Sequence, residues 1–208
     1  MARRFVTRFF DRVSGIYDAP ALQRNVYRPN HDAVVAVLQQ MRPGSVADVG
    51  CGSGVLTARI ADEFDIPVHG CDPSPGLLAK GIARSSKVSW HEASAERLPL
   101  EDSSVDAVTT TEAFHFFDQP TALAEFRRVL RPRGFIVIAS FNLYPWIARL
   151  TGRDHQDAPL TTAKILSERI SRCDYTVLGQ WPVKRFTRIW VPTTLTLARP
   201  NSPAGSVA

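Results

Sequence analysis

The chain has 208 residues, of which 44% are hydrophobic and 22% charged, a composition typical of a folded domain and not of a disordered chain. Its net charge of +5 comes from arginines and lysines scattered along the sequence, which argues against a nucleic-acid partner. There is no apolar run of about 18 residues and the cysteines lack metal-ligand spacing, so we expect a cytoplasmic protein without a membrane-spanning helix or metal site.

Residues 1–42 are predicted to form a helical arm. Its first half repeats apolar residues at every fourth position with arginines between them, as amphipathic helices do. These residues are Phe5, Phe9, Val13 and Tyr17. Such a helix could pack on the domain, close over a ligand site as a lid, or lie on an anionic membrane surface, and we favour packing or a lid. Asn30 is expected to cap a second helix that ends near Met41.

Residues 46–57 are predicted to form a strand, a glycine-rich turn and the start of a helix. Gly50, Gly52 and Gly54 stand at alternate positions, and glycine adopts positive φ at little cost and lets a ligand approach the backbone. The spacing fits neither the dinucleotide pattern nor the P-loop. Asp48 comes two positions before the first glycine, and a carboxylate there favours a cationic ligand over a pyrophosphate. A turn without a ligand is the weaker alternative, because alternating glycines weaken local structure.

Residues 45–142 alternate between predicted strands and helices. After the first strand, further strands are expected over residues 66–71, 87–91, 105–110 and 135–141, with helices over 55–64 and 120–130. This alternation is typical of a mostly parallel sheet with helices on both faces, which binds its ligand at the carboxyl ends of the strands. Asp72 ends the second strand, where an acid accepts hydrogen bonds from ribose hydroxyls, and it could also cap the following helix.

Several segments occur in a characteristic order and spacing. They are Asp48–Gly54, Asp72, Ala93–Pro99, Val105–Asp106 and Arg131–Gly134. This order resembles that of the class I S-adenosylmethionine-dependent methyltransferases, in the small-molecule branch that includes ubiquinone and menaquinone methyltransferases. The resemblance implies a Rossmann-like, doubly wound α/β fold over residues 43–200, with a mostly parallel seven-stranded sheet whose last strand is antiparallel. Residues 201–208 would be a flexible tail.

The resemblance also implies S-adenosyl-L-methionine as cofactor and assigns its contacts. Asp48 and the backbone of Gly50, Gly52 and Gly54 would hold the methionine end, and Asp72 the ribose hydroxyls. The residues beside the adenine would be Pro73, Ser74, Leu77, Ala95 and Glu96. Thr110 or Thr111 would present backbone to the amino group of the cofactor. Ser94 stands where the family often has Asp, so its bond to the adenine amino group would be weaker.

The chemistry implied is methyl transfer by in-line displacement to a small-molecule or lipid-like acceptor. Positioning supplies most of the acceleration in such a reaction, and a base is needed only where the acceptor must lose a proton. His115 is the best candidate base, although a loop histidine can also be structural. Glu112 could orient the acceptor or cap the next helix, and Tyr17 could close the acceptor pocket. Phe114, Phe116 and Phe117 could line it or belong to the core.

The C-terminal part, residues 143–208, is predicted to hold a helix over 161–172 and strands over 175–180 and, in part, 185–197. Arg149 and Arg153 suggest an acceptor with a carboxylate or phosphate, provided that they face the cleft. The expected partner is the acceptor, with no nucleic acid and no stable membrane insertion, and the protein would be a monomer or homodimer. The alternative function is a non-catalytic sensor or partner protein that binds S-adenosylmethionine.

Overall fold

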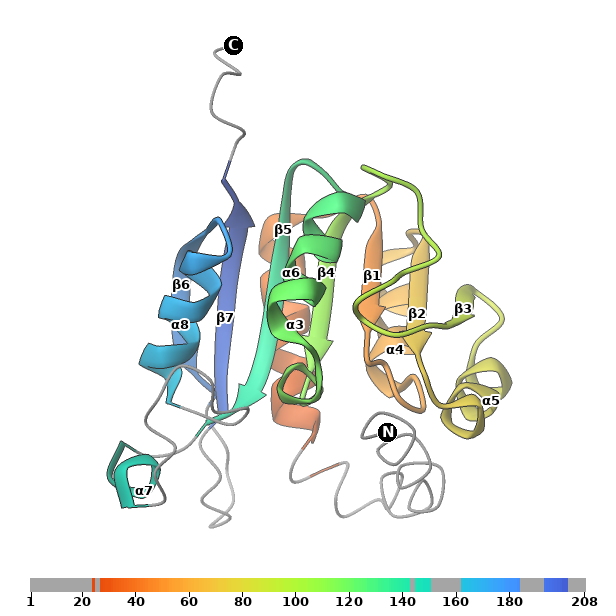
Figure 1. The fold of residues 1–208 in the computed structure, drawn as a ribbon. Coiled ribbons are helices and arrows are strands. Elements are labelled where there is room, and N and C mark those ends of the chain that lie inside the picture. The colour runs from red at the N-terminus through yellow and green to blue at the C-terminus, as the bar shows by residue number, and fades with distance from the viewer. Residues whose placement is uncertain (1–23, 25–26, 143–144, 151–161, 184–192, 202–208) are drawn as a thin grey trace.

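A computed structural model of the chain shows one seven-stranded sheet between two layers of helices (Figure 1). The structure describes residues 24, 27–142, 145–150, 162–183 and 193–201. Tyr17, Arg153, most of the predicted arm, residues 185–192 of the last predicted strand and the predicted tail beyond Asn201 therefore lie outside the described residues. In the part of the chain that is described, no helix is long and apolar enough to cross a bilayer.

The strands are β1 (Val46–Val49), β2 (Val68–Asp72), β3 (Val88–Glu92), β4 (Val105–Thr111), β5 (Leu130–Phe141), β6 (Tyr175–Pro182) and β7 (Thr193–Pro200). The helices are α3 (Arg28–Met41), α4 (Val55–Phe64), α5 (Pro75–Arg84), α6 (Gln119–Val129), α7 (Pro145–Leu150) and α8 (Ala163–Arg172), with a 3-10 turn η2 (Phe114–Phe116). The predicted strand and helix order from residue 46 onward is confirmed.

The strand order is β3-β2-β1-β4-β5-β7-β6, and β7 runs antiparallel to both of its neighbours. This confirms the predicted sheet with an antiparallel last strand. β1 pairs in parallel with both β2 and β4, so the chain order reverses at β1. Open α/β sheets bind ligands at such a reversal, beyond the carboxyl ends of the strands.

Two apolar clusters fill the space between the sheet and its helices. On one face, α3 and α4 contribute Val34, Leu38 and Ile60, which are fully buried with Val46 and Val137 of the sheet. On the other face, α6 and α8 bury the residues Ala122, Leu123, Phe126, Leu166 and Ile170. Because both faces of the sheet are covered, β1 is buried along its whole length. The second half of the predicted arm, α3, thus packs into the core of the domain.

Among several small differences between the predicted and observed element boundaries, two have a clear physical reason. α3 begins at Arg28 with Pro29 in its first turn, where proline is favoured, so Asn30 is not the cap and lies fully buried inside the helix. β5 begins at Leu130, five residues before the predicted start at Phe135, because Leu130 already pairs with Val105. The turn expected at 131–134 is an irregularity within this strand, with Arg133 at φ +71°.

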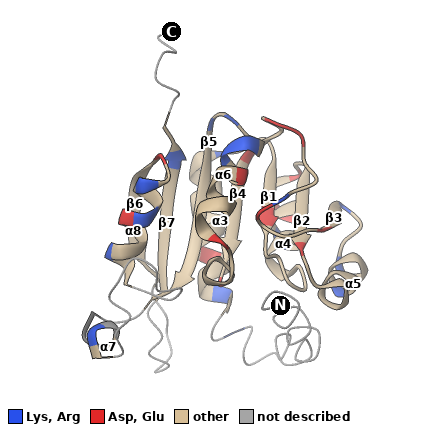
Figure 2. Ribbon diagram, viewed as in Figure 1, with Lys and Arg blue, Asp and Glu red and all other residues tan. Residues whose placement is uncertain are grey.

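Lysine and arginine residues occur on several elements, among them α5, α6, α7 and α8 (Figure 2). The described positive charge is therefore not confined to one element.

Candidate active site

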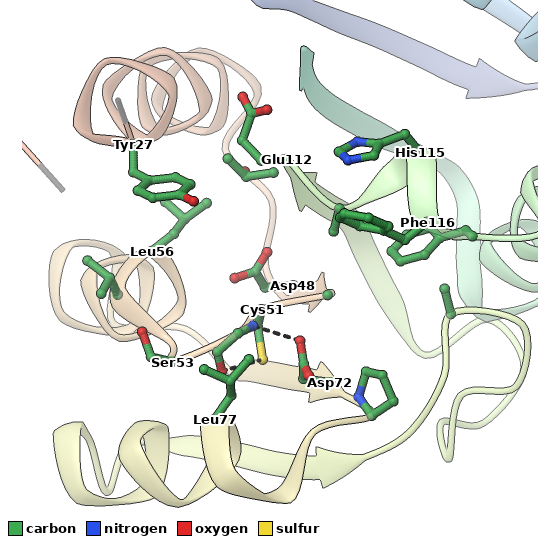
Figure 3. Close-up of a pocket in the computed structure, with 18 of the residues that line it drawn as sticks. Tyr27, Asp48, Cys51, Ser53, Leu56, Asp72, Leu77, Glu112, His115 and Phe116 are labelled. Atoms are coloured by element: carbon green, nitrogen blue, oxygen red, sulfur yellow. Dashed lines mark hydrogen bonds between the residues drawn. The ribbon is translucent and has the colours of Figure 1, made fainter. Parts of the chain in front are cut away.

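A pocket of about 370 Å³ opens at the carboxyl ends of β1, β2 and β4 (Figure 3). This volume lies in the range of small-molecule sites. The pocket is lined by most of the predicted site residues, namely Asp48, Gly50, Gly52, Asp72, Pro73, Leu77, Ser94, Ala95, Glu96, Thr111, Glu112 and His115. The other predicted residues that the structure describes, Gly54, Ser74 and Thr110, lie behind this lining.

The three glycines of the turn all have positive φ, but their surroundings differ. A Cβ on Gly50 would lie 2.5 Å from the Ala113 Cβ, and one on Gly54 would lie 2.2 Å from the Trp90 ring. A Cβ on Gly52 would meet no described atom within 4 Å. Packing therefore requires Gly50 and Gly54, whereas Gly52 leaves its space open to the pocket.

Asp48 brings a buried carboxylate to the end of β1. Its Oδ2 accepts a hydrogen bond from the Thr57 hydroxyl at 2.5 Å, and its Oδ1 accepts one from the Thr109 hydroxyl at 2.9 Å. Burial raises the pKa of Asp48 to about 6, an effect that these two bonds oppose and the nearby charge of Asp72 reinforces. A cation in the pocket would relieve the cost of this buried charge.

Asp72 fixes the glycine turn from the end of β2. Its Oδ2 accepts from the Gly52 N–H at 2.8 Å, and its Oδ1 accepts from the Ser74 N–H at 2.9 Å. Ser74 is the N-cap of α5, where its hydroxyl accepts from the Leu77 N–H. Helix capping and orientation of the Asp72 carboxylate account for the position of Ser74, which is 1% exposed.

Glu112 joins the end of β4 to α3. Its Oε1 accepts a hydrogen bond from the Asn30 Nδ2 at 2.5 Å, and its Oε2 accepts from the Phe141 N–H at 3.2 Å. Glu112 is the N-cap of neither η2 nor α6, so the predicted capping role is wrong. Its φ of +56° is unusual for a residue other than glycine, and such strain is concentrated at functional sites.

Aromatic side chains form a further wall of the pocket, which adjoins the glycine turn at Phe117, 3.1 Å from a Cβ placed on Gly50. The residues of this wall are Tyr27, His31, His115, Phe116, Phe117 and Phe141. Phe114 is not among them, because it is 1% exposed and belongs to the core. The Nδ1 atom of His115 is buried without a hydrogen-bond partner among the described residues, and burial lowers the pKa of this side chain to about 4. Its imidazole is therefore neutral at pH 7 and can accept a hydrogen bond from a ligand.

The sequence of the chain matches that of known proteins. A family model described as a methyltransferase domain matches residues 47–138. Demethylmenaquinone methyltransferase from Beutenbergia cavernae is 33% identical over 189 residues, which cover 85% of this chain and 76% of that protein. The chain belongs to the S-adenosylmethionine-dependent methyltransferases. The predicted family and the predicted enzyme class are thus confirmed.

Two further relatives extend the comparison of this methyltransferase. Malonyl-[acyl-carrier protein] O-methyltransferase from Hahella chejuensis is 32% identical over 140 residues, which cover 65% of this chain and about half, 49%, of that protein. The solved structure of 1,6-didemethyltoxoflavin-N1-methyltransferase from Burkholderia thailandensis, with bound 1,6-didemethyltoxoflavin and S-adenosylhomocysteine, covers 96% of this chain and 87% of its own, with a TM-score of 0.69 and 20% identity. This likeness shows the shared fold.

The pocket of the methyltransferase fits its cofactor, S-adenosyl-L-methionine, in charge and in space. The cofactor carries a sulfonium and an ammonium group, and the described lining contains the acids Asp48, Asp72, Glu96 and Glu112 but no lysine or arginine. The open space at Gly52 admits a ligand close to the backbone.

The sequence predicted an acceptor with a carboxylate or phosphate, provided that Arg149 and Arg153 face the pocket. Arg149 is exposed and is not among the described residues that line the pocket, and Arg153 lies outside the described part of the chain. The described wall thus gives no support to an anionic acceptor.

Sequence reasoning missed Tyr27 and His31, which bring the start of α3 to the pocket. Their rings stack with centroids 6.3 Å apart. A spacing of four residues on one helix face was the available signal. Its meaning depended on where α3 packs, which the sequence of the helix does not specify.

Asn30→Ala is expected to lower the free energy of unfolding by about 2 kcal/mol, because the buried Glu112 carboxylate would lose a donor. Urea denaturation measures this loss. Asp32→Asn is the matched control on the same helix, since it weakens the 2.5 Å ion pair with Arg59, in which Asp32 is 53% exposed. Such surface pairs contribute about 0–1 kcal/mol. Equal losses in both variants would contradict a special role for the bond between Asn30 and Glu112.

Proposed function

We propose that this methyltransferase transfers a methyl group to a small-molecule or lipid-like acceptor that lies against the aromatic wall. The supporting observation is the arrangement of the pocket, with Asp48, Asp72 and the glycine turn on one side and Tyr27, His115 and Phe116 on the other, where Glu112 also lies (Figure 3). Phe116 lines the pocket and is 49% exposed, so its ring is accessible to an apolar acceptor. The name of the Beutenbergia cavernae relative, demethylmenaquinone methyltransferase, refers to a lipid-like acceptor of this kind.

The cofactor side of the pocket is assigned to residues of this chain. When bound, S-adenosyl-L-methionine supplies an electrophilic methyl group on a positively charged sulfur. Asp48 and the backbone of the glycine turn hold the methionine end, and Asp72 accepts hydrogen bonds from the ribose hydroxyls. Pro73, Leu77 and the segment of Ser94, Ala95 and Glu96 enclose the adenine, and the backbone of Thr111 faces the amino group. Ser74 and Thr110 act from behind this wall.

His115 is proposed to act on the molecule that receives the methyl group, by accepting a hydrogen bond from the group that loses its proton. Its imidazole is neutral at pH 7, and Figure 3 shows it on the far side of the cavity from the glycine turn. With a pKa of about 4, His115 accepts a hydrogen bond and aligns the acceptor, but it holds a full proton only weakly. Alignment is therefore its main contribution, and the proton passes on to solvent.

The rest of the chain is assigned to support this site. Because Tyr27 lies at the pocket, the part of the arm that precedes α3 is assigned the role of a lid, with Tyr17 as a closing residue. Residues 43–200 together with α3 form the catalytic domain, and residues 201–208 a tail. The protein acts in the cytoplasm as a monomer or homodimer, without nucleic acid and without stable membrane insertion.

The function is tested by incubating the protein with methyl-labelled S-adenosylmethionine and a fractionated cell extract. Label is expected in the low-mass or organic-soluble fraction. Asp72→Ala should abolish transfer and weaken S-adenosylhomocysteine binding at least about 100-fold, because a charge-assisted contact and a turn contact are lost together. Label in RNA or protein would contradict the proposed acceptor class. Tight binding of S-adenosylhomocysteine without transfer to any fraction would favour the sensor.

A further inference from the structure

The segment that follows β3, residues 93–104, forms part of the pocket wall although it has almost no regular structure. Its one bridge of strand type joins Ser94 to Arg97. Ser94, Ala95 and Glu96 line the pocket, and directly after them Leu98 is buried in the core. Something outside the segment must therefore hold these residues in place.

Part of that support comes from the ends of the wall itself, where the Ala93 N–H donates to the Asp72 carbonyl at 3.1 Å and the Glu96 Oε1 accepts from the Asp118 N–H at 2.8 Å. The rest comes from α6, whose residues lie outside the described pocket lining. Glu125 and Arg128, one turn apart on this helix, form a bidentate pair, with Nε to Oε2 at 2.8 Å and Nη2 to Oε1 at 2.7 Å. The Glu125 Oε1 accepts from the Leu98 N–H at 2.6 Å, and the Arg128 Nη2 donates to the Leu98 carbonyl at 3.1 Å. Both backbone polar groups of Leu98 are thus held by this pair.

Arg128 extends the same contact along the segment. Its Nη1 donates to the Leu100 carbonyl at 2.8 Å and to the Asp102 Oδ1 at 2.6 Å. One guanidinium therefore fixes three residues of the segment, which its planar set of donors allows and a lysine could not match. The ion pairs alone contribute little, because Arg128 is 33% exposed. Their effect lies in restricting the backbone, since ordering a residue on binding costs conformational entropy.

We infer that Arg128 is a positioning residue for the cofactor: through Leu98 and Leu100 it preorganises the wall formed by Ser94, Ala95 and Glu96. This inference rests on the proposed placement of that wall beside the adenine. If the wall were loose, cofactor binding would have to order it, and the affinity would fall by that cost. Arg128 acts without contact to the ligand.

The neighbouring residue supplies a matched control. Arg127 lies on the same helix and is 36% exposed. Its Nη2 donates to the carbonyl oxygens of Asp174 at 3.1 Å and Asn201 at 2.6 Å. These partners precede β6 and follow β7, at the other end of the sheet from β3. Arg127→Gln and Arg128→Gln therefore remove the same charge and bonds to two backbone carbonyl oxygens each, but only the second releases the pocket wall.

The experiment is titration calorimetry with S-adenosylhomocysteine on the full chain, together with hydrogen exchange over residues 93–104. Arg128→Gln is expected to raise the Kd about tenfold and to speed exchange in that segment, with protection partly restored by the ligand. Arg127→Gln should change the Kd less than about twofold, because its contacts lie elsewhere. Arg128→Lys, which keeps the charge and can reach one carbonyl, should fall between the wild type and Arg128→Gln.

Each outcome decides between the alternatives. An unchanged Kd in Arg128→Gln, or an equal rise in Arg127→Gln, would overturn the inference while leaving the cofactor site intact. If Arg128→Gln does not fold, the Kd of Arg128→Lys decides, and a wild-type value would overturn the inference. Failure of the wild type to bind S-adenosylhomocysteine would contradict the cofactor site itself.

Discussion

Gly50→Ala is expected to abolish S-adenosylhomocysteine binding and to lower the free energy of unfolding by about 3 kcal/mol. Two costs combine. The φ of +71° is strained for alanine, and the new Cβ would lie 2.5 Å from the Ala113 Cβ, far inside van der Waals contact. Relief requires the turn to move away from Ala113, and this movement also displaces Gly52 and its bond to Asp72.

Gly52→Ala is the matched variant, because its φ of +56° is similarly strained but its Cβ would meet no described atom within 4 Å. We expect a stability loss of only about 1 kcal/mol. The methyl group would occupy space on the pocket side, so binding should still weaken strongly. Thermal melting with and without S-adenosylhomocysteine measures both effects. If Gly50→Ala were as stable as Gly52→Ala, the close packing of the turn on Ala113 would be wrong.

The elements of the sheet could be predicted from sequence because their signals are local. The run from Val46 to Gly54 contains a buried strand, its turn and a helix start within a few residues. The alternation of apolar strands and amphipathic helices then specifies a parallel sheet, and the carboxyl ends of its strands specify where the pocket lies. Asp48, Gly52 and Asp72 were found in this way, since each stands at a strand end or in the turn that follows.

The contacts that could not be predicted join residues far apart in the chain. Asn30 reads as a helix cap because asparagine is a good one, but its side chain reaches Glu112, 82 positions away. Arg128 reads as an exposed residue at the end of a helix, where a positive charge is ordinary. Its contacts with Leu98 and Leu100 depend on how α6 lies over the segment after β3, which no local pattern specifies.

The two kinds of residue also differ in what they do for the site. Most residues found from local pattern touch the ligand space, whereas Glu125 and Arg128 hold a backbone segment in position; Glu112 does both. A site of this kind needs both, because contacts are effective only when their supports are fixed before binding. Cofactor affinity should therefore respond to substitutions in α6 that never meet the cofactor.

Asp48→Asn is expected to stabilise the protein without ligand while it removes most of the affinity for the cofactor. Burial raises the pKa of Asp48 from its usual 3.8 to about 6. The folded state therefore binds the proton more tightly than the unfolded state. The stability associated with that proton is complete below about pH 4 and is lost as the pH rises through 6. At pH 7.5 the buried charge costs about 3 kcal/mol, which asparagine avoids.

The expected result of Asp48→Asn is a melting temperature several degrees above the wild type at pH 7.5, with the difference vanishing near pH 4. S-adenosylhomocysteine carries an ammonium group, and loss of its partner charge should weaken binding about 100-fold or more. In the wild type, affinity should fall as the pH drops below 6, because protonated Asp48 no longer attracts a cation. Melting curves and calorimetry between pH 5 and pH 8 measure both trends.

Asp106→Asn is the control for Asp48→Asn, since Asp106 pairs with Arg131 at 3.0 Å near the start of β4 and is absent from the described pocket lining. It should lower stability slightly and leave binding unchanged. A fall in the melting temperature of Asp48→Asn at pH 7.5 would show that the bonds from Thr57 and Thr109 outweigh the cost of burial. Unchanged binding would place the cationic part of the cofactor away from β1. The melting temperature and the binding affinity together show why the protein has a carboxylate at this position. A carboxylate that serves only to bind the charge of the ligand should destabilise the protein without ligand, whereas one that serves stability should not.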